Sequence, residues 1–118
     1  MAENLLVEQS KEFAVKIIAL CDVLYGRGKA TPIINQLLRS GTSVGANIHE
    51  ANYASSRADF VNKLQIALKE SYETDYWLTV FHESAILSDE EHKELSSRNN
   101  RIRKMLTSSI TTAKKGLE

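Results

Sequence analysis

The sequence predicts an all-α protein: one domain over residues 1–118, folded as an up-down-up-down antiparallel four-helix bundle. Apolar residues recur at three- and four-residue steps through most of the chain, which is the spacing of one helix face. Five glycines and one proline leave few breakpoints, and these fall near the expected helix ends. The expected helices cover about residues 3–25, 32–54, 57–86 and 89–115. Their short connections make consecutive helices antiparallel neighbours.

The first two helices follow from seams of apolar and small residues. The first seam is Leu6, Phe13, Ile17, Leu20 and Leu24, and it ends at the glycine-containing stretch YGRGK. The second helix is expected to begin with Thr31 as its N-cap and Pro32 in the first turn, where a missing N–H has no cost. Its seam continues through Ile34, Leu38, Gly41, Gly45 and Ile48.

The stretch SGTSVGANIHEA, residues 40–51, could be a phosphate-binding loop or a helix face. A P-loop needs a lysine and then a hydroxyl directly after its second glycine, but Ala46 and Asn47 follow Gly45. A dinucleotide-binding turn needs three glycines after a strand. Two glycines four residues apart instead leave one helix face free of side chains. We therefore predict a helix that packs closely on a neighbour.

The third and fourth helices each begin with a serine followed three residues later by an acid, which is a capping-box pattern: Ser56 with Asp59, and Ser88 with Glu91. The expected seam of the third helix is Val61, Leu64, Leu68, Ser71, Asp75, Leu78 and Ala85. The expected seam of the fourth is Leu95, Ile102, Leu106, Ile110 and Ala113, and Gly116 closes that helix.

One segment of the third helix is more apolar than a single bundle requires. YWLTVF, residues 76–81, is apolar or aromatic at every position except Thr79, so apolar side chains surround the helix. Such a surface usually marks a protein interface. We expect a homo-oligomer, and its candidate interface residues are Ile66, Trp77, Val80 and Phe81.

Composition excludes several classes of protein. The single Cys21 cannot form an intrachain disulfide, and no signal peptide or membrane-spanning run is evident, so we expect a cytoplasmic protein without membrane association. The chain contains no Glu-x-x-His, which argues against a di-metal carboxylate site in the bundle. No spacing selects a serine or cysteine nucleophile with a histidine and an acid. We therefore expect no enzyme activity, no metal or other cofactor, and no small-molecule substrate.

Polar residues at or beside the seams predict an internal hydrogen-bond network, because buried polar groups need partners. Its candidate members are Asn47, Glu50, Ser71, Asp75 and Asn99. Such a network can fix helix register at some cost in stability. The same residues could instead bind a ligand, which is the less favoured interpretation.

Charge is distributed unevenly although the net charge is zero. Residues 51–90 carry three basic and seven acidic side chains, whereas residues 91–118 carry seven basic and three acidic ones. The simplest interpretation is that these helices attract each other or are separately solvated. The alternative is nucleic-acid contact through Arg98, Arg101, Arg103, Lys104 and Lys115 of the fourth helix. No aromatic residues interleave with them, so contact with phosphates is the most they indicate.

The chain also resembles a known family. SGTSVGANIHEANYASSRADFVNKLQIALKESYETDYWL, residues 40–78, is similar to the signature of bacterial four-helix-bundle proteins encoded in intervening sequences of 23S rRNA genes. Their relatives include the accessory protein of diversity-generating retroelements. The resemblance implies a cytoplasmic, non-enzymatic homopentamer. The ribosomal name of the family reflects gene location, not membership of the ribosome.

Three hypotheses follow. The leading one is a homo-oligomeric scaffold or binding module. The second is an accessory protein that binds RNA or DNA, as the resemblance to the retroelement relatives implies, with a reverse transcriptase as a further partner; zero net charge departs from their strongly basic surface. The third is an enzyme or metal protein, which the residue patterns disfavour.

Overall fold

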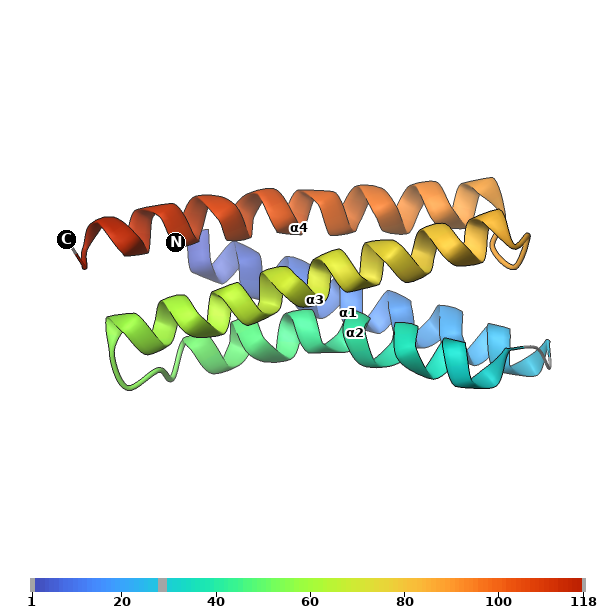
Figure 1. Cartoon of the computed structure of the whole chain (residues 1–118), viewed down its shortest axis with the longest axis horizontal. Helices are drawn as coiled ribbons and strands as arrows, with labels where there is room; N and C mark the ends of the chain where they lie inside the picture. Colours follow the sequence, from blue (N-terminus) through green and yellow to red (C-terminus); the bar gives the residue numbers. More distant parts are fainter. Residues whose placement is uncertain (1, 28–29, 118) are drawn as a thin grey trace.

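The helices run alternately up and down along one long axis (Figure 1). The computed structural model describes residues 2–27 and 30–117. Its helices are α1 (Ala2–Gly26), α2 (Thr31–Ala51), α3 (Arg57–Glu83) and α4 (Asp89–Lys115), and no described residue forms a strand. The bundle measures 49 × 22 × 19 Å, and both termini lie at the same end (Figure 1).

Each helix packs against two others. α1 and α3 both contact α2 and α4, and the described residues of α1 and α3 do not contact each other. α1 and α3 therefore occupy opposite corners of the bundle. This arrangement follows from the short turns, which place each helix beside the one before it.

The core is formed by one apolar stripe from each helix. Its fully buried large side chains are Leu6, Phe13, Ile17 and Leu24 from α1, Ile34, Leu37 and Val44 from α2, Leu78 and Phe81 from α3, and Ile102 and Leu106 from α4. No described helix has the length and apolarity needed to cross a bilayer.

The stretch 40–51 is helical, and its glycines face α1, which confirms the close-packing prediction. A Cβ atom on Gly41 would lie 2.9 Å from Cγ2 of Ile17, and one on Gly45 would lie 3.1 Å from the backbone oxygen of Ser10. Even an alanine methyl group would crowd both places. The two glycines therefore set how closely α2 approaches α1.

The helix starts agree with two of the three expected caps. The Ser56 side chain accepts a hydrogen bond from the Asp59 N–H, and Ser88 with Glu91 forms a complete capping box. Thr31 is not the N-cap of α2. That position is taken by Ala30, which has φ 51° and offers no side-chain cap, and Pro32 follows in the first turn.

Two helices end earlier than expected. After Ala51 the chain continues with i to i+3 bonds, such as Tyr53 N–H to the Glu50 carbonyl, so the last turn tightens and α2 stops. α3 ends at Glu83, because Ala85 adopts a left-handed φ of 61°. The backbone N–H groups of Ile86 and Leu87 then both donate to the Phe81 carbonyl, which turns the chain toward α4.

Candidate functional site

Two pairs of buried polar side chains cross the interior. Ser71 Oγ of α3 donates to Asn99 Oδ1 of α4 at 2.8 Å, and Asn99 Nδ2 donates back to the Ser71 carbonyl at 2.9 Å. Thr74 Oγ1 of α3 and Ser40 Oγ of α2 are joined by a 3.0 Å hydrogen bond. All four residues are fully buried. Polar contacts therefore link α3 to both of its neighbours.

The predicted network is thus correct for Ser71 and Asn99 and wrong for its other members. Asn47 donates to the Ser43 carbonyl one turn earlier in its own helix. Glu50 is exposed and pairs with Lys63 at 3.6 Å. Asp75 is half-buried and forms no hydrogen bond or ion pair with any described residue. These three side chains lie beside the seams, not on them.

Ser40 and Thr74 are not among the predicted network residues. Ser40 is part of the small-residue stretch 40–51, whose pattern predicts only a packing face. Thr74 lies three residues after Ser71 and four before Leu78, which is a seam spacing. That spacing was the available signal, but the expected seam stepped from Ser71 to Asp75 instead.

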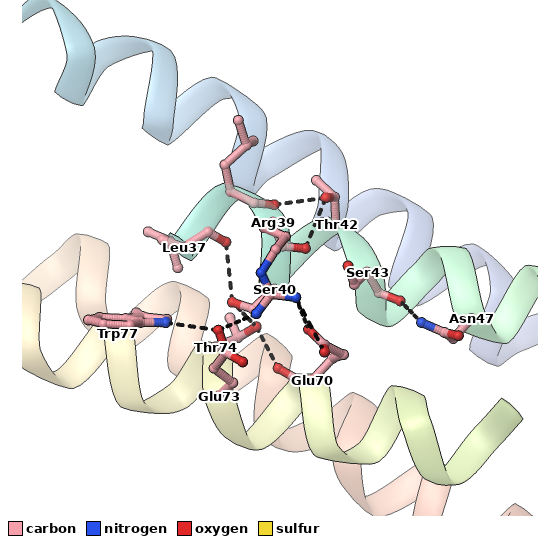
Figure 2. A network of polar contacts seen from close by, with 11 residues as sticks. Leu37, Arg39, Ser40, Thr42, Ser43, Asn47, Glu70, Glu73, Thr74 and Trp77 are labelled. Carbon is pink, nitrogen blue, oxygen red and sulfur yellow. Dashed lines mark hydrogen bonds and ion pairs between the residues drawn. The ribbon is translucent and has the colours of Figure 1, made fainter. Parts of the chain in front are cut away.

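A surface cluster lies beside the Ser40–Thr74 pair (Figure 2). Arg39 of α2 reaches across to α3, where it pairs with Glu70 at 3.2 Å and also with Glu73. Trp77 Nε1 donates to the same Glu73 carboxylate at 3.1 Å. Partial burial raises the pKa of Glu73, but the hydrogen bonds from Arg39 and Trp77 outweigh it and hold the pKa below its ordinary value. The cluster closes the α2–α3 seam at the surface.

The basic residues of α4 divide into two groups. Arg98 is held by Glu12 at 3.1 Å and Glu94 at 3.5 Å, and its side chain is only 25% exposed. The Arg103 guanidinium lies 4.8 Å from the centroid of the Tyr72 ring, a cation–π distance. These two arginines serve contacts within the chain.

The remaining basic residues of that prediction are Arg101, Lys104 and Lys115. They are exposed, and no described residue forms an ion pair with them. Their helical spacing places them on one outward line, with Ser108 between them. This line is the part of α4 that remains open to an anionic partner.

The apolar surface differs from the expected one. Phe81 is 1% exposed and belongs to the core, so its place among the interface residues is wrong. Ile66, Trp77 and Val80 are half-buried, and Tyr76, whose ring packs edge-on to that of Trp77 at 4.9 Å, is 59% exposed. The largest group of exposed aliphatic side chains lies on α1: Leu5, Val15, Ile18 and Val23 are between 51% and 61% exposed.

Two of the three histidines, His82 and His92, form contacts at the α3–α4 turn. His82 Nε2 lies 2.6 Å from Asp89 Oδ1, and the His82 ring stacks on that of His92 with the centroids 4.3 Å apart. Across the described residues, no group of three or more His, Cys, Asp or Glu side chains is arranged to hold a metal ion. The contacts instead fasten the start of α4 to the end of α3.

Fold and surface together define a class of protein. It is a four-helix bundle with buried hydrogen bonds between helices, an exposed line of basic residues on α4 and exposed apolar side chains on α1. The model of the 23S rRNA-intervening sequence protein family matches residues 2–108, and the chain belongs to that family. A crystal structure of a protein of unknown function from the S23 ribosomal protein family of Bacteroides thetaiotaomicron is similar, with 44% identity and a TM-score of 0.91. The match covers 94% of this chain and 99% of that one. No functionally curated protein matches.

Proposed function

We propose that the chain is a non-enzymatic subunit of a homo-oligomeric scaffold or binding module. The observation that carries this proposal is the exposure of Leu5, Val15, Ile18 and Val23 on one helix. Scattered apolar residues are normal on a surface, but several on one outward face usually mark a site of association. Burial of such side chains against another copy would remove them from water.

The test is the mass of the purified protein in solution. One chain has a mass of 13.2 kDa, and light scattering coupled to size exclusion should report a multiple of it. Five copies, the number that the family resemblance implies, would give about 66 kDa. A mass of one chain at every concentration up to about 100 μM would overturn the proposal, because a micromolar or tighter association would be visible there.

A second candidate function is binding to RNA or DNA phosphates. The observation that favours it is the exposed line of Arg101, Lys104 and Lys115, which form no ion pair with an acidic side chain in the described part of the chain. Repetition of this line around an oligomer would form a large basic surface although each chain is neutral. Tyr72 also lies beside Arg103, so the structure brings an exposed aromatic ring closer to the basic helix than the fourth helix alone suggested.

This second function predicts binding that is steeply weakened by salt, because each neutralised phosphate releases counterions. We expect Arg101→Ala with Lys104→Ala to weaken binding to single-stranded RNA and to reduce the salt dependence. Lys11→Ala with Arg57→Ala removes the same charge elsewhere on the exposed surface and serves as the matched control. Absence of wild-type binding at about 50 mM salt would exclude this function.

A further inference from the structure

Two outward stripes on opposite helices have matching spacing. The α1 stripe is Leu5, Glu8, Glu12, Val15 and Ala19, and the α3 stripe is Ile66, Lys69, Glu73, Tyr76 and Val80. Both follow the same steps of three, four, three and four residues. In each stripe the first, fourth and fifth residues are apolar or aromatic. Since α1 and α3 occupy opposite corners of the bundle, the stripes lie on opposite sides of the subunit.

Charges at the remaining positions are complementary or already neutralised. The second residues are Glu8 and Lys69, which have opposite charge and are both exposed. The third residues, Glu12 and Glu73, have like charge, but each pairs with an arginine of its own chain: Glu12 with Arg98 at 3.1 Å, and Glu73 with Arg39. The two stripes could therefore lie side by side without repulsion between unpaired like charges at these positions.

A single apolar face would pair with itself and stop at a dimer, whereas two unlike faces on opposite sides join copies head to tail into a larger assembly. Up-down-up-down topology makes α1 and α3 run in the same direction (Figure 1). Copies related by rotation about the long axis therefore present these helices in parallel. With the two stripes aligned residue for residue, Leu5 faces Ile66, Glu8 faces Lys69 and Val15 faces Tyr76.

We infer that the α1 stripe of one copy packs in parallel along the α3 stripe of the next copy, in a heterologous contact that repeats from copy to copy. This inference rests on the proposed homo-oligomer and adds which surfaces meet. It leaves the outer faces of α2 and α4 uncovered, including the line of Arg101, Lys104 and Lys115.

The test uses two single substitutions at facing, exposed positions. Val15 and Tyr76 are 61% and 59% exposed, so Val15→Lys and Tyr76→Lys should fold normally, which circular dichroism checks. Ser108→Lys, at an exposed position of α4, is the matched control and should keep the wild-type mass. If a lysine variant fails to fold, Val15→Glu or Tyr76→Glu replaces it.

Val15→Lys alone and Tyr76→Lys alone should each have the mass of one chain, because each lysine blocks one of the two stripes. An equimolar mixture should have the mass of two, about 26 kDa, because one intact α1 stripe meets one intact α3 stripe and both outer ends are blocked. The inference is overturned if either variant keeps the wild-type mass, if either forms a dimer alone, or if the mixture stays monomeric. A monomeric wild type would instead refute the proposed function itself, so the two failures are distinguishable.

Discussion

Ser71 and Asn99 donate one hydrogen bond to each other across the α3–α4 interface, through the Ser71 hydroxyl and the Asn99 amide. Both residues are 0% exposed, so water cannot replace either bond. A shift of one helix along the other by a single turn would separate both donors from their acceptors. The pair therefore favours one register of α3 and α4. The apolar stripes alone would specify this register less strictly.

Replacement of Asn99 by alanine should lower the free energy of unfolding by about 2–4 kcal/mol. The substitution leaves the Ser71 hydroxyl without its acceptor and opens a cavity in the core. Urea denaturation followed by circular dichroism measures the effect. Asn100→Ala, one residue away and exposed, should change stability by no more than about 0.5 kcal/mol. Equal midpoints for the two variants would show that the buried pair does not stabilise the fold.

The helices could be predicted from sequence because their caps, breakpoints and apolar spacing agree along the chain. The exact seam of α3 could not be predicted. From Leu64 the observed seam continues through Ala67, Ser71, Thr74, Leu78 and Phe81, whereas the predicted one passed through Leu68 and Asp75. Both routes use steps of three and four residues. Periodicity alone does not choose between them, since they lie only part of a turn apart on the helix.

This one ambiguity explains two errors in the predicted sites. The route through Asp75 placed a carboxylate where Thr74 bonds to Ser40, and it left Phe81 outside the core. A clue was present in composition: Thr74 can satisfy its hydroxyl on its own backbone, as it does with the Glu70 carbonyl at 2.8 Å, whereas a buried carboxylate needs a charged or hydrogen-bonding partner. The outward line of Arg101, Lys104 and Lys115 could be placed from sequence, but what it binds could not.

Gly45→Ala should destabilise the protein although alanine favours helices by about 1 kcal/mol. The new methyl group would lie 3.1 Å from the Ser10 backbone oxygen, and backbone atoms of a packed helix cannot move aside cheaply. Gly41→Ala should cost at least as much, because its methyl group would lie 2.9 Å from the buried Ile17 side chain. Thermal unfolding of each variant measures the net effect, which we expect to be about 1–3 kcal/mol.

Gly26→Ala is the internal control for the glycine variants. No atom of the described residues lies within 4 Å of a Cβ atom built at Gly26, the last residue of α1. This substitution should be neutral or slightly stabilising, because helix propensity acts without a clash. If all three alanine variants were equally stable, the close approach of α1 and α2 would not depend on the glycines.

Protonation of Glu73 should be visible in the fluorescence of Trp77, the only tryptophan of the chain, because the indole donates to this carboxylate. Its midpoint should lie below the ordinary pKa of a glutamate, and Arg39→Gln should move it upward. Because the folded-state pKa is depressed, the stability that this carboxylate contributes is present above the unfolded-state pKa. It is lost as pH falls through the folded-state value.

The stability difference between wild type and Arg39→Gln should therefore shrink on acidification from about pH 5 toward pH 3. Arg57→Gln, which removes an exposed arginine at the start of α3, should leave the fluorescence midpoint unchanged. A midpoint that is the same in wild type and Arg39→Gln would mean that the arginine does not hold the carboxylate in solution.

Cys21 should resist thiol reagents as long as the protein is folded. Its side chain is 1% exposed, and burial raises the pKa of the thiol to about 11 because the charged thiolate is poorly solvated there. The thiolate is the reactive form, so modification at pH 8 should be at least about a hundredfold slower than for a free cysteine. Full reactivity in urea is the control, and rapid stoichiometric labelling of the folded chain would contradict the burial.

The same thiol should make stability depend on alkaline pH. A folded-state pKa raised above the unfolded value contributes stability that is present below the unfolded pKa, near 8.5, and is lost as pH rises toward the folded value of about 11. Cys21→Ala lacks this ionisation and loses some packing at all pH values. The stability advantage of wild type over Cys21→Ala should therefore be constant below about pH 8 and decrease between about pH 8.5 and 11. Urea midpoints of both proteins across this range measure it, and a constant difference would show that the thiol does not ionise on unfolding.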